Sequence, residues 1–324
     1  MTRARDLANI ADGDITGTLT LDGLTVAGNV SVDGGTIKLD GNYPTGTGNV
    51  ALGDTALDSV QSGGNYNIAL GHNAGTAITT GANNTAVGYQ ALSTEDGNGN
   101  STAIGYRALK TQNAGAEAYN VAVGVDAGLD ITTGVRNTLL GTFAGSNLSS
   151  GNYNVAIGYN SLGTENAHGF NTAVGYQTLK FLDAGADAYN VALGYQAGLS
   201  VTTGVNNTLI GGLAADAITT GGNNVAIGYR SLTADTQGSR SIAIGRNALN
   251  TQNFTSATDS NNVAIGYIAM ADNTTGANNT AIGNEALANN TTADQNTAVG
   301  YLALTANTTG ANNTAMGKSA LGSN

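Results

Sequence analysis

The sequence predicts an all-β protein built as a repetitive parallel β-solenoid or β-roll, with about sixteen coils of about 17 residues. A motif, Asn-x-Ala-(Val/Ile/Leu)-Gly, recurs along most of the chain. Eleven of the fifteen intervals between its glycines are 17 residues, and the others are 18, 19, 19 and 21. The motif also alternates apolar and polar residues as a short strand does. Its structural glycines are Gly53, Gly71, Gly88, Gly105, Gly124, Gly141, Gly158, Gly175, Gly194, Gly211, Gly228, Gly245, Gly266, Gly283, Gly300 and Gly317.

One unit, Asn84–Leu92, shows how a coil is expected to form. Asn-Thr-Ala-Val is a short strand, and Gly88 allows a positive φ or a close backbone approach at the corner. The next residues, Tyr-x-Ala-Leu, form a second short strand or a turn that buries the leucine. Longer intervals are loops that bulge from the stack. Residues 105–144 resemble residues 175–214, a duplication shifted by 70 residues, or four units.

Composition limits the function. The chain has 324 residues, of which 48 are Gly, one is Pro, none is Cys or Trp, and 10% are charged. Small aliphatic residues suit a narrow core, and the lack of cysteine excludes a disulfide framework and thiolate metal sites. A net charge of −11 argues against nucleic acid and anionic membranes as partners. No segment approaches the ~20 apolar residues of a membrane helix, so we expect no membrane insertion.

Two regions are expected along the chain. Residues 1–45 form an N-terminal attachment or capping region, in which residues 18–23, 30–34 and 36–41 read as short strands ended by Asp-Gly. Residues 46–324 form the solenoid. The first ten residues contain no apolar run typical of a secretory signal.

Few residues are candidates for chemistry. The two histidines, His72 and His168, stand at unlike places in their units and predict neither a catalytic triad nor a metal cluster. We expect the carboxylates to be solvated in loops, and we therefore predict no enzyme, no metal site and no cofactor. Those carboxylates are Glu95, Asp96, Glu117, Asp183 and Asp187.

Tyrosines are the candidates for surface binding. Four precede the motif asparagine, namely Tyr66, Tyr119, Tyr153 and Tyr189. Such rows either cover the corner of each coil, line a contact between chains, or stack against sugars. The eight that follow the motif glycine are Tyr89, Tyr106, Tyr159, Tyr176, Tyr195, Tyr229, Tyr267 and Tyr301.

The repeats resemble two groups of surface proteins. Asn154–Gly158 and Ser241–Gly245 match the Asn-Ser-Val-Ala-Ile-Gly signature of the head repeats of trimeric autotransporter adhesins. The Asn-Thr-Ala-x-Gly-Tyr-x-Ala-Leu arrays are similar to those of bacteriophage tail fibres. The likeness covers residues 49–321, and it implies a rod-like parallel homotrimer in which three β-rolls pack side by side. Residues 4–8, Ala-Arg-Asp-Leu-Ala, look like the start of phage fibre proteins.

We therefore expect a structural fibre that attaches a virion, through a tail fibre or similar appendage, to a host cell surface. Its expected partners are itself, other virion or appendage proteins through the N-terminal region, and a host surface glycan or protein, with no nucleic acid. The expected location is the virion. The alternative is a bacterial surface adhesin or extracellular filament subunit, located outside the cell or on its surface. An ice-binding solenoid and an enzyme are the remaining alternatives.

Overall fold

A computed structural model describes residues 46–323, and its regular elements are all β-strands. The attachment or capping region expected at residues 1–45 lies outside the described residues. The strands are β1 (Val50–Leu52), β2 (Ile68–Leu70), β3 (Thr85–Val87), β4 (Thr102–Ile104), β5 (Val121–Val123), β6 (Thr138–Leu140), β7 (Val155–Ile157), β8 (Thr172–Val174), β9 (Val191–Leu193), β10 (Thr208–Ile210), β11 (Val225–Ile227), β12 (Gly238–Ser239), β13 (Ile242–Ile244), β14 (Thr258–Asp259), β15 (Val263–Ile265), β16 (Thr280–Ile282), β17 (Thr297–Val299) and β18 (Thr314–Met316).

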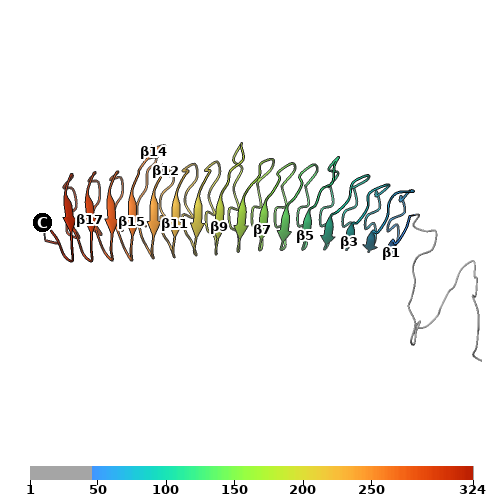
Figure 1. The fold of residues 1–324 in the computed structure, drawn as a ribbon, viewed down its shortest axis with the longest axis horizontal. Coiled ribbons are helices and arrows are strands. Elements are labelled where there is room, and N and C mark those ends of the chain that lie inside the picture. The colour runs from blue at the N-terminus through green and yellow to red at the C-terminus, as the bar shows by residue number, and fades with distance from the viewer. Residues whose placement is uncertain (1–45, 324) are drawn as a thin grey trace, which may run out of the picture. The chain divides into compact units, whose positions relative to one another are not determined.

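Sixteen of these strands form one parallel sheet in sequence order, and each coil contributes one strand (Figure 1). The register is uniform, so that the central alanine of one strand pairs with the central residue of the next, as Ala156 does with Ala173. The short strands β12 and β14 pair with each other in a second sheet. The predicted fold class, an all-β parallel solenoid of about sixteen coils, is confirmed.

The motif glycines form the corners of the coils. Their φ angles lie between +116° and +144°, a region that side chains disfavour. Space is lacking as well, because a Cβ on Gly158 would lie 2.2 Å from the carbonyl oxygen of Gly175 in the next coil. A Cβ on Gly175 would lie at the same distance from the carbonyl oxygen of Gly194. The glycines therefore permit both the turn and the close stacking of coils.

After the corner, Tyr-x-Ala-Leu forms a turn and not a second strand. The leucine is buried, as the pattern predicts, and Leu92, for example, has a φ of +49°. The residue before the motif asparagine is also left-handed, with a φ of +59° at Asn83. Repeated left-handed residues let a coil of 17 residues close within a narrow cross-section.

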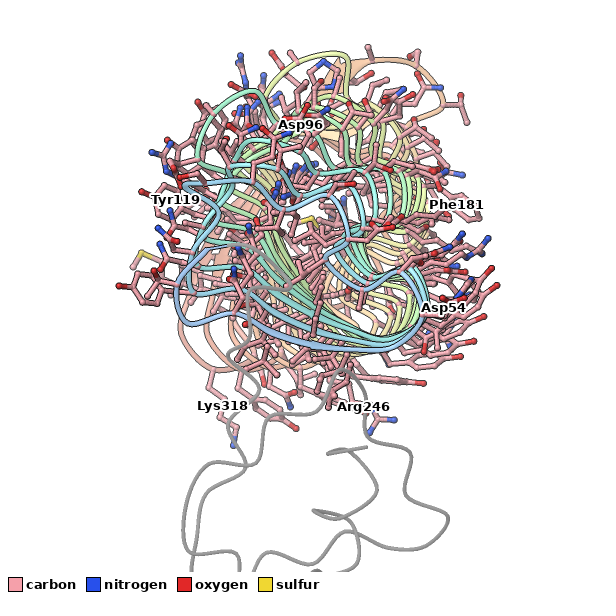
Figure 2. All side chains as sticks on the ribbon, turned by 90° about the vertical axis from the view of Figure 1, so that its right-hand side faces the viewer. Asp54, Asp96, Tyr119, Phe181, Arg246 and Lys318 are labelled. Atoms are coloured by element: carbon pink, nitrogen blue, oxygen red, sulfur yellow. The ribbon has the colours of Figure 1, made fainter. Side chains whose placement is uncertain are left out.

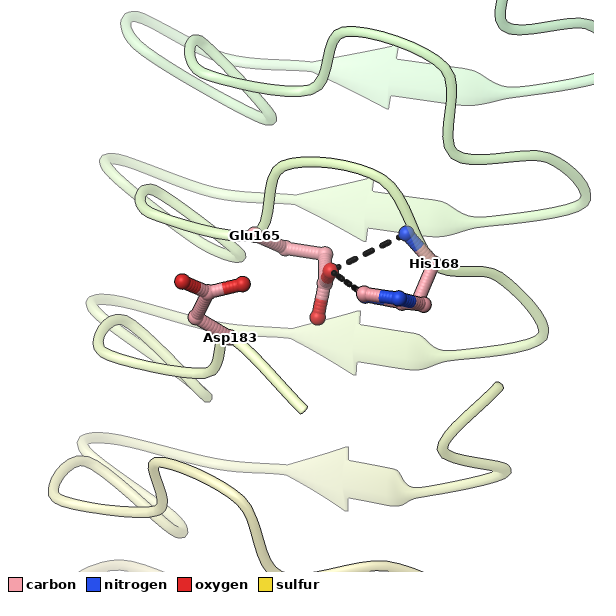
Figure 3. A group of neighbouring side chains, drawn as sticks. All are labelled: Glu165, His168 and Asp183. Carbon is pink, nitrogen blue, oxygen red and sulfur yellow. Dashed lines mark hydrogen bonds and ion pairs between the residues drawn. The ribbon is translucent and has the colours of Figure 1, made fainter. Parts of the chain in front are cut away.

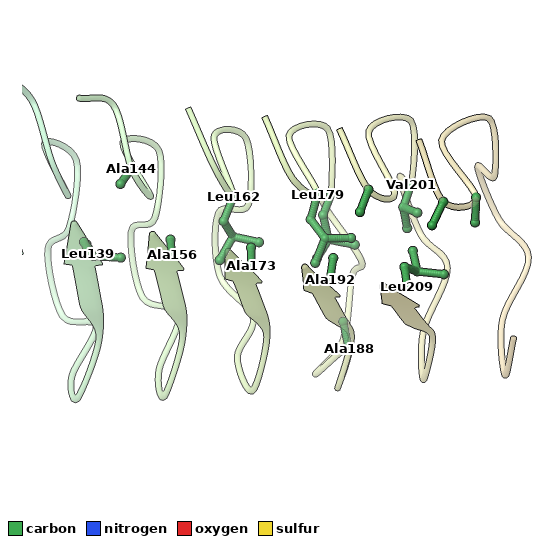
Figure 4. Packing of buried hydrophobic residues seen from close by; sticks show 14 of the residues in the cluster. Leu139, Ala144, Ala156, Leu162, Ala173, Leu179, Ala188, Ala192, Val201 and Leu209 are labelled. Atoms are coloured by element: carbon green, nitrogen blue, oxygen red, sulfur yellow. The ribbon is translucent and has the colours of Figure 1, made fainter. Parts of the chain in front are cut away.

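The core is a narrow column in which small and large residues compensate each other (Figure 4). Most strands bury an alanine, but β6 buries Leu139, close to where side chains on Gly128 and Gly145 would project. A Cβ on Gly128 would lie 2.7 Å from a Leu139 methyl group, and one on Gly145 would lie 2.8 Å from another. In the same way, a Cβ on Gly198 would lie 2.6 Å from a methyl group of Leu209. A leucine on the strand thus lies where neighbouring glycines leave space in the turns.

The motif asparagines form a buried ladder along the stack. The Oδ1 of Asn137 accepts a hydrogen bond of 2.9 Å from the backbone N–H of Asn154 in the next coil. Its Nδ2 donates to the carbonyl oxygen of Gly151 at 2.8 Å. Because buried backbone groups need partners, an asparagine such as Asn137 fixes two points of the coil that follows it.

A longer repeat of four coils is superimposed on the single coil. We define three blocks, residues 89–158, 159–228 and 229–300, each ending at a motif glycine. The second coil of every block carries the extra residues, so its interval is 19, 19 or 21 instead of 17. Glu95, Glu165 and Asp235 occupy the same place, seven residues after the glycine that precedes each block.

Candidate functional site

The outer face of the sixteen-stranded sheet is predominantly apolar. In each strand only the central residue points into the core, whereas the first and third residues are partly or fully exposed. The first position holds Val or Ile in eight strands and Thr in eight. The third position is aliphatic in fifteen strands and Met316 in the last. A continuous apolar strip therefore runs along the whole sheet, which is unusual for the surface of a soluble monomer.

The predicted tyrosines after the motif glycine lie beside this face at the corners of the coils. All eight are 42–55% exposed. Tyr159, Tyr176 and Tyr195 stack on consecutive coils with ring centroids 5.4 and 5.3 Å apart. Tyr89 stacks on Tyr106 at 5.3 Å. Figure 2 looks along the stack, and residues that occupy the same position in other coils, Asp54, Arg246 and Lys318, lie at successive points around it. The row thus winds about the solenoid.

A second column of rings follows the position before the motif asparagine. Tyr153, Phe170 and Tyr189 stack at 5.1 and 5.0 Å, and the Arg136 guanidinium lies over the rings of Tyr119 and Tyr153. All five residues have a positive φ, which bulky residues adopt at a cost of about 1 kcal/mol or more. The sequence pattern identifies the tyrosines but not the contributions of Arg136 and Phe170, because neither matches the repeat.

Each block has a buried carboxyl group at the same position on the loop side of the stack. Glu95, Glu165 and Asp235 are 0% exposed. The expectation that Glu95 is a solvated loop residue is therefore wrong. An acid in a polar sequence context gives no sign of burial, and only the four-coil comparison reveals that the position recurs.

In the first and third blocks a glutamine side chain donates a hydrogen bond to the buried acid. The Nε2 of Gln112 donates to Glu95 Oε2 and to Ser101 Oγ, both at 2.9 Å. Its Oε1 accepts from Asn120 Nδ2 at 2.8 Å.

The third block repeats this arrangement. Gln252 Nε2 donates to Asp235 Oδ2 at 2.6 Å and to Ser241 Oγ at 2.9 Å, while Asn262 donates to its Oε1. Burial raises the pKa of the Asp235 carboxyl, and the hydrogen bonds from Gln252, Phe254 and Gly238 oppose that rise.

The second block differs. Glu165 Oε1 accepts from the backbone N–H of His168 at 3.1 Å and faces its Nδ1 at 3.2 Å. Its Oε2 has no hydrogen-bond partner among the described residues. Burial raises the pKa of the Glu165 carboxyl, the His168 contacts oppose the rise, and the Asp183 carboxyl adds to it. The structure thus groups His168 with two acids, contrary to the expectation that neither histidine joins such a cluster.

Fold and surface together define a β-solenoid repeat protein. Comparison with family models, with curated proteins and with solved structures gave no match. Among the described residues, no helix is long and apolar enough to cross a bilayer.

Proposed function

We propose that this chain is the subunit of a structural fibre, a virion tail fibre or similar appendage that attaches to a host cell surface. The observation that carries the proposal is the apolar strip on the outer face of the sheet. Fifteen aliphatic residues and one methionine line its third positions over the full length of the stack. Burying such a strip is favourable by about 25 cal/mol per Å², so it calls for a partner of matching length.

Other copies of the same chain fit this requirement best. A partner must present complementary apolar residues at the same rise per coil over sixteen coils, and a second solenoid has that spacing by construction. A parallel homotrimer, in which three sheets face a common axis, buries the strip of every chain and leaves the loop sides outward. The resemblance of the motif to trimeric adhesin heads and phage fibres supports this arrangement.

The aromatic rows support a role in attachment. Stacked, half-exposed rings present hydroxyl groups and ring edges at regular intervals, and a trimer presents three such sets. Repeated weak contacts of this kind give avidity well above that of a single contact. The receptor is then a surface glycan or protein, and residues 1–45 connect the rod to other virion or appendage proteins.

Solution mass tests the proposal. Light scattering of the purified chain should give about three times 32.2 kDa. Replacing exposed aliphatic residues of the strip, as in Leu140→Glu combined with Leu193→Glu, should lower the mass to that of a monomer. Thr133→Glu, at an exposed loop position, is the control and should leave the trimer intact. A monomeric wild-type protein contradicts the fibre.

A bacterial surface adhesin or extracellular filament subunit is the second candidate, because the same apolar strip and aromatic rows serve it equally. Neighbouring genes separate the two. Tail genes support the virion fibre, and secretion genes support the adhesin.

A further inference from the structure

The three blocks provide an internal comparison at the buried acid. Four positions follow it at fixed offsets in every block: the third, sixth, seventeenth and eighteenth residues after the acid. The first block has Asn98, Ser101, Gln112 and Asn113, and the third has Gly238, Ser241, Gln252 and Asn253. Both sets are uncharged, and both contain the glutamine that donates to the acid.

In the second block the same positions hold His168, Asn171, Leu182 and Asp183. Leucine in place of glutamine removes the donor, which leaves Glu165 Oε2 unpartnered. It is one of two buried side-chain polar atoms without a hydrogen bond in the described part of the chain. His168 and Asp183 bring an imidazole and a carboxylate to this place, and both are side chains that bind metal ions. The second block therefore lacks the glutamine that donates to the acid in the other blocks, and at these positions it has two metal-binding side chains that they lack.

The three side chains converge on one point. The carboxyl group of Glu165 lies between the imidazole of His168 and the carboxyl group of Asp183 (Figure 3). One donor atom from each residue lies within 4.8 Å of the others. Glu165 is fully buried, the His168 side chain is 24% exposed, and Asp183 is exposed. The cluster is therefore anchored inside the coil and reachable from solvent on its Asp183 side.

We propose that Glu165, His168 and Asp183 bind a divalent transition-metal ion, with Zn²⁺ as the best-suited candidate. One imidazole and two carboxylates form a ligand set that zinc accepts, and water completes the four positions. In a four-coordinate tetrahedral site, metal–ligand distances of about 2.0–2.2 Å place two ligand atoms about 3.3–3.6 Å apart. Because the donor atoms lie within 4.8 Å of one another, binding requires an inward movement on the order of 1 Å, which the exposed Asp183 side chain can supply.

Charge supports the same assignment. Two carboxylates face each other here, and within residues 46–323 the one cation-forming group that contacts Glu165 is His168. A buried carboxylate without a partner is costly. A bound dication compensates both acids and supplies the partner that Gln112 and Gln252 supply in the other blocks.

The ion links consecutive coils. Glu165 and His168 belong to the loop that follows one coil corner, and Asp183 belongs to the next coil, just before its two-residue insertion. We expect bound metal to stabilise the stack at that insertion. This role is independent of the proposed fibre function, since it concerns the interior of a single solenoid.

The test uses the full chain without an affinity tag, stripped with a chelator. Calorimetric titration with Zn²⁺ should show one ion per chain, and saturation should raise the midpoint of thermal unfolding. His168→Asn and Asp183→Asn place the residue types of the first block at these positions, so both should fold. Each should weaken Zn²⁺ binding by more than about ten-fold and abolish the thermal shift.

His72→Asn, which removes the other histidine, is the control and should bind Zn²⁺ like the wild type. Circular dichroism of each variant verifies the fold. The proposal is overturned if the stripped wild-type chain takes up no Zn²⁺. It is also overturned if either folded variant binds as tightly as the wild type.

Discussion

The first and second blocks have the same coil spacing and the same backbone path, yet the side chains around the buried acid differ between them. The first block surrounds Glu95 with neutral donors, and the second leaves one oxygen of Glu165 unpartnered beside a histidine and an aspartate. Because the fold is the same, we infer that the interior side chains are exchanged as sets. The backbone corners do not vary between the blocks.

The largest effects are therefore expected at the corners. Gly175→Ala places a Cβ 2.2 Å from the Gly194 carbonyl oxygen at a φ of +136°. The next coil must move, so we expect a loss of more than about 3 kcal/mol in the free energy of unfolding. Thermal and denaturant unfolding followed by circular dichroism measures it.

Gly185→Ala in the same block is the matched control. Its φ is +71°, but nothing lies within 4 Å of the added Cβ. It should cost only about 1 kcal/mol, from backbone strain alone. Equal losses in the two variants would contradict the conclusion that the close approach of the next coil adds to the cost at the corners.

A second experiment converts the first block toward the second. Gln112→Leu removes the donor to Glu95 Oε2 and Ser101 Oγ and the acceptor for Asn120. Unsatisfied buried polar groups cost about 1–3 kcal/mol each, so a marked loss of stability is expected.

The double variant Ser101→Asn with Gln112→Leu reproduces the residue pair of the second block. It should recover part of the stability, because an asparagine at this position can donate to a carbonyl oxygen as Asn171 does. Additive losses in the double-mutant cycle would contradict the idea that these residues are exchanged as a set.

Much of the fold follows from the sequence. The spacing of Gly88 and its equivalents fixes the coil, and the alternation of Thr85, Ala86 and Val87 fixes which side chain is buried. The turn at Tyr-x-Ala-Leu is harder to predict from the sequence, because leucine rarely adopts the positive φ seen at Leu92. Stacking of whole coils overrides that local preference.

The cluster around Glu165 is much harder to predict. Its members come from two coils, and their approach depends on the loop preceding the two-residue insertion. Nothing in the local sequence distinguishes Glu165 from a solvated acid. The one available signal is the 70-residue offset that aligns Glu165 with Glu95 and Asp235, since it exposes the exchange of Gln112 for Leu182.

The stability of the fold depends on pH through the buried carboxyl group of Asp235. Burial raises its pKa above the ordinary value of 3.8, so the folded state holds this proton more tightly than the unfolded state. The contribution of this carboxyl to stability is complete below 3.8 and is lost as the pH rises through the elevated pKa.

Asp235→Asn removes this titration. We expect the stability of the wild type relative to this variant to increase as the pH falls from 7 toward 4, as measured by unfolding midpoints at each pH. A difference that does not change with pH would mean that Asp235 titrates alike in the folded and unfolded chain.

The smallest effect is expected in the ring column that the first and second blocks share. Phe170 has a φ of +62° and stacks on Tyr153 and Tyr189. Phe170→Asn exchanges ring contacts worth about 0.5–1.5 kcal/mol each for a residue that tolerates this conformation. The two terms nearly cancel, so unfolding should change by less than about 1 kcal/mol.

Asn206→Phe is the reciprocal variant, because Asn206 is the next residue of this column and has a φ of +58°. It should extend the stack by one ring, again with little effect on stability. If Phe170→Asn leaves the unfolding midpoint unchanged but weakens adhesion to host cells, the rings serve attachment. If it destabilises the chain as much as Gln112→Leu does, the column is a structural brace, and the attachment surface must lie elsewhere on the rod.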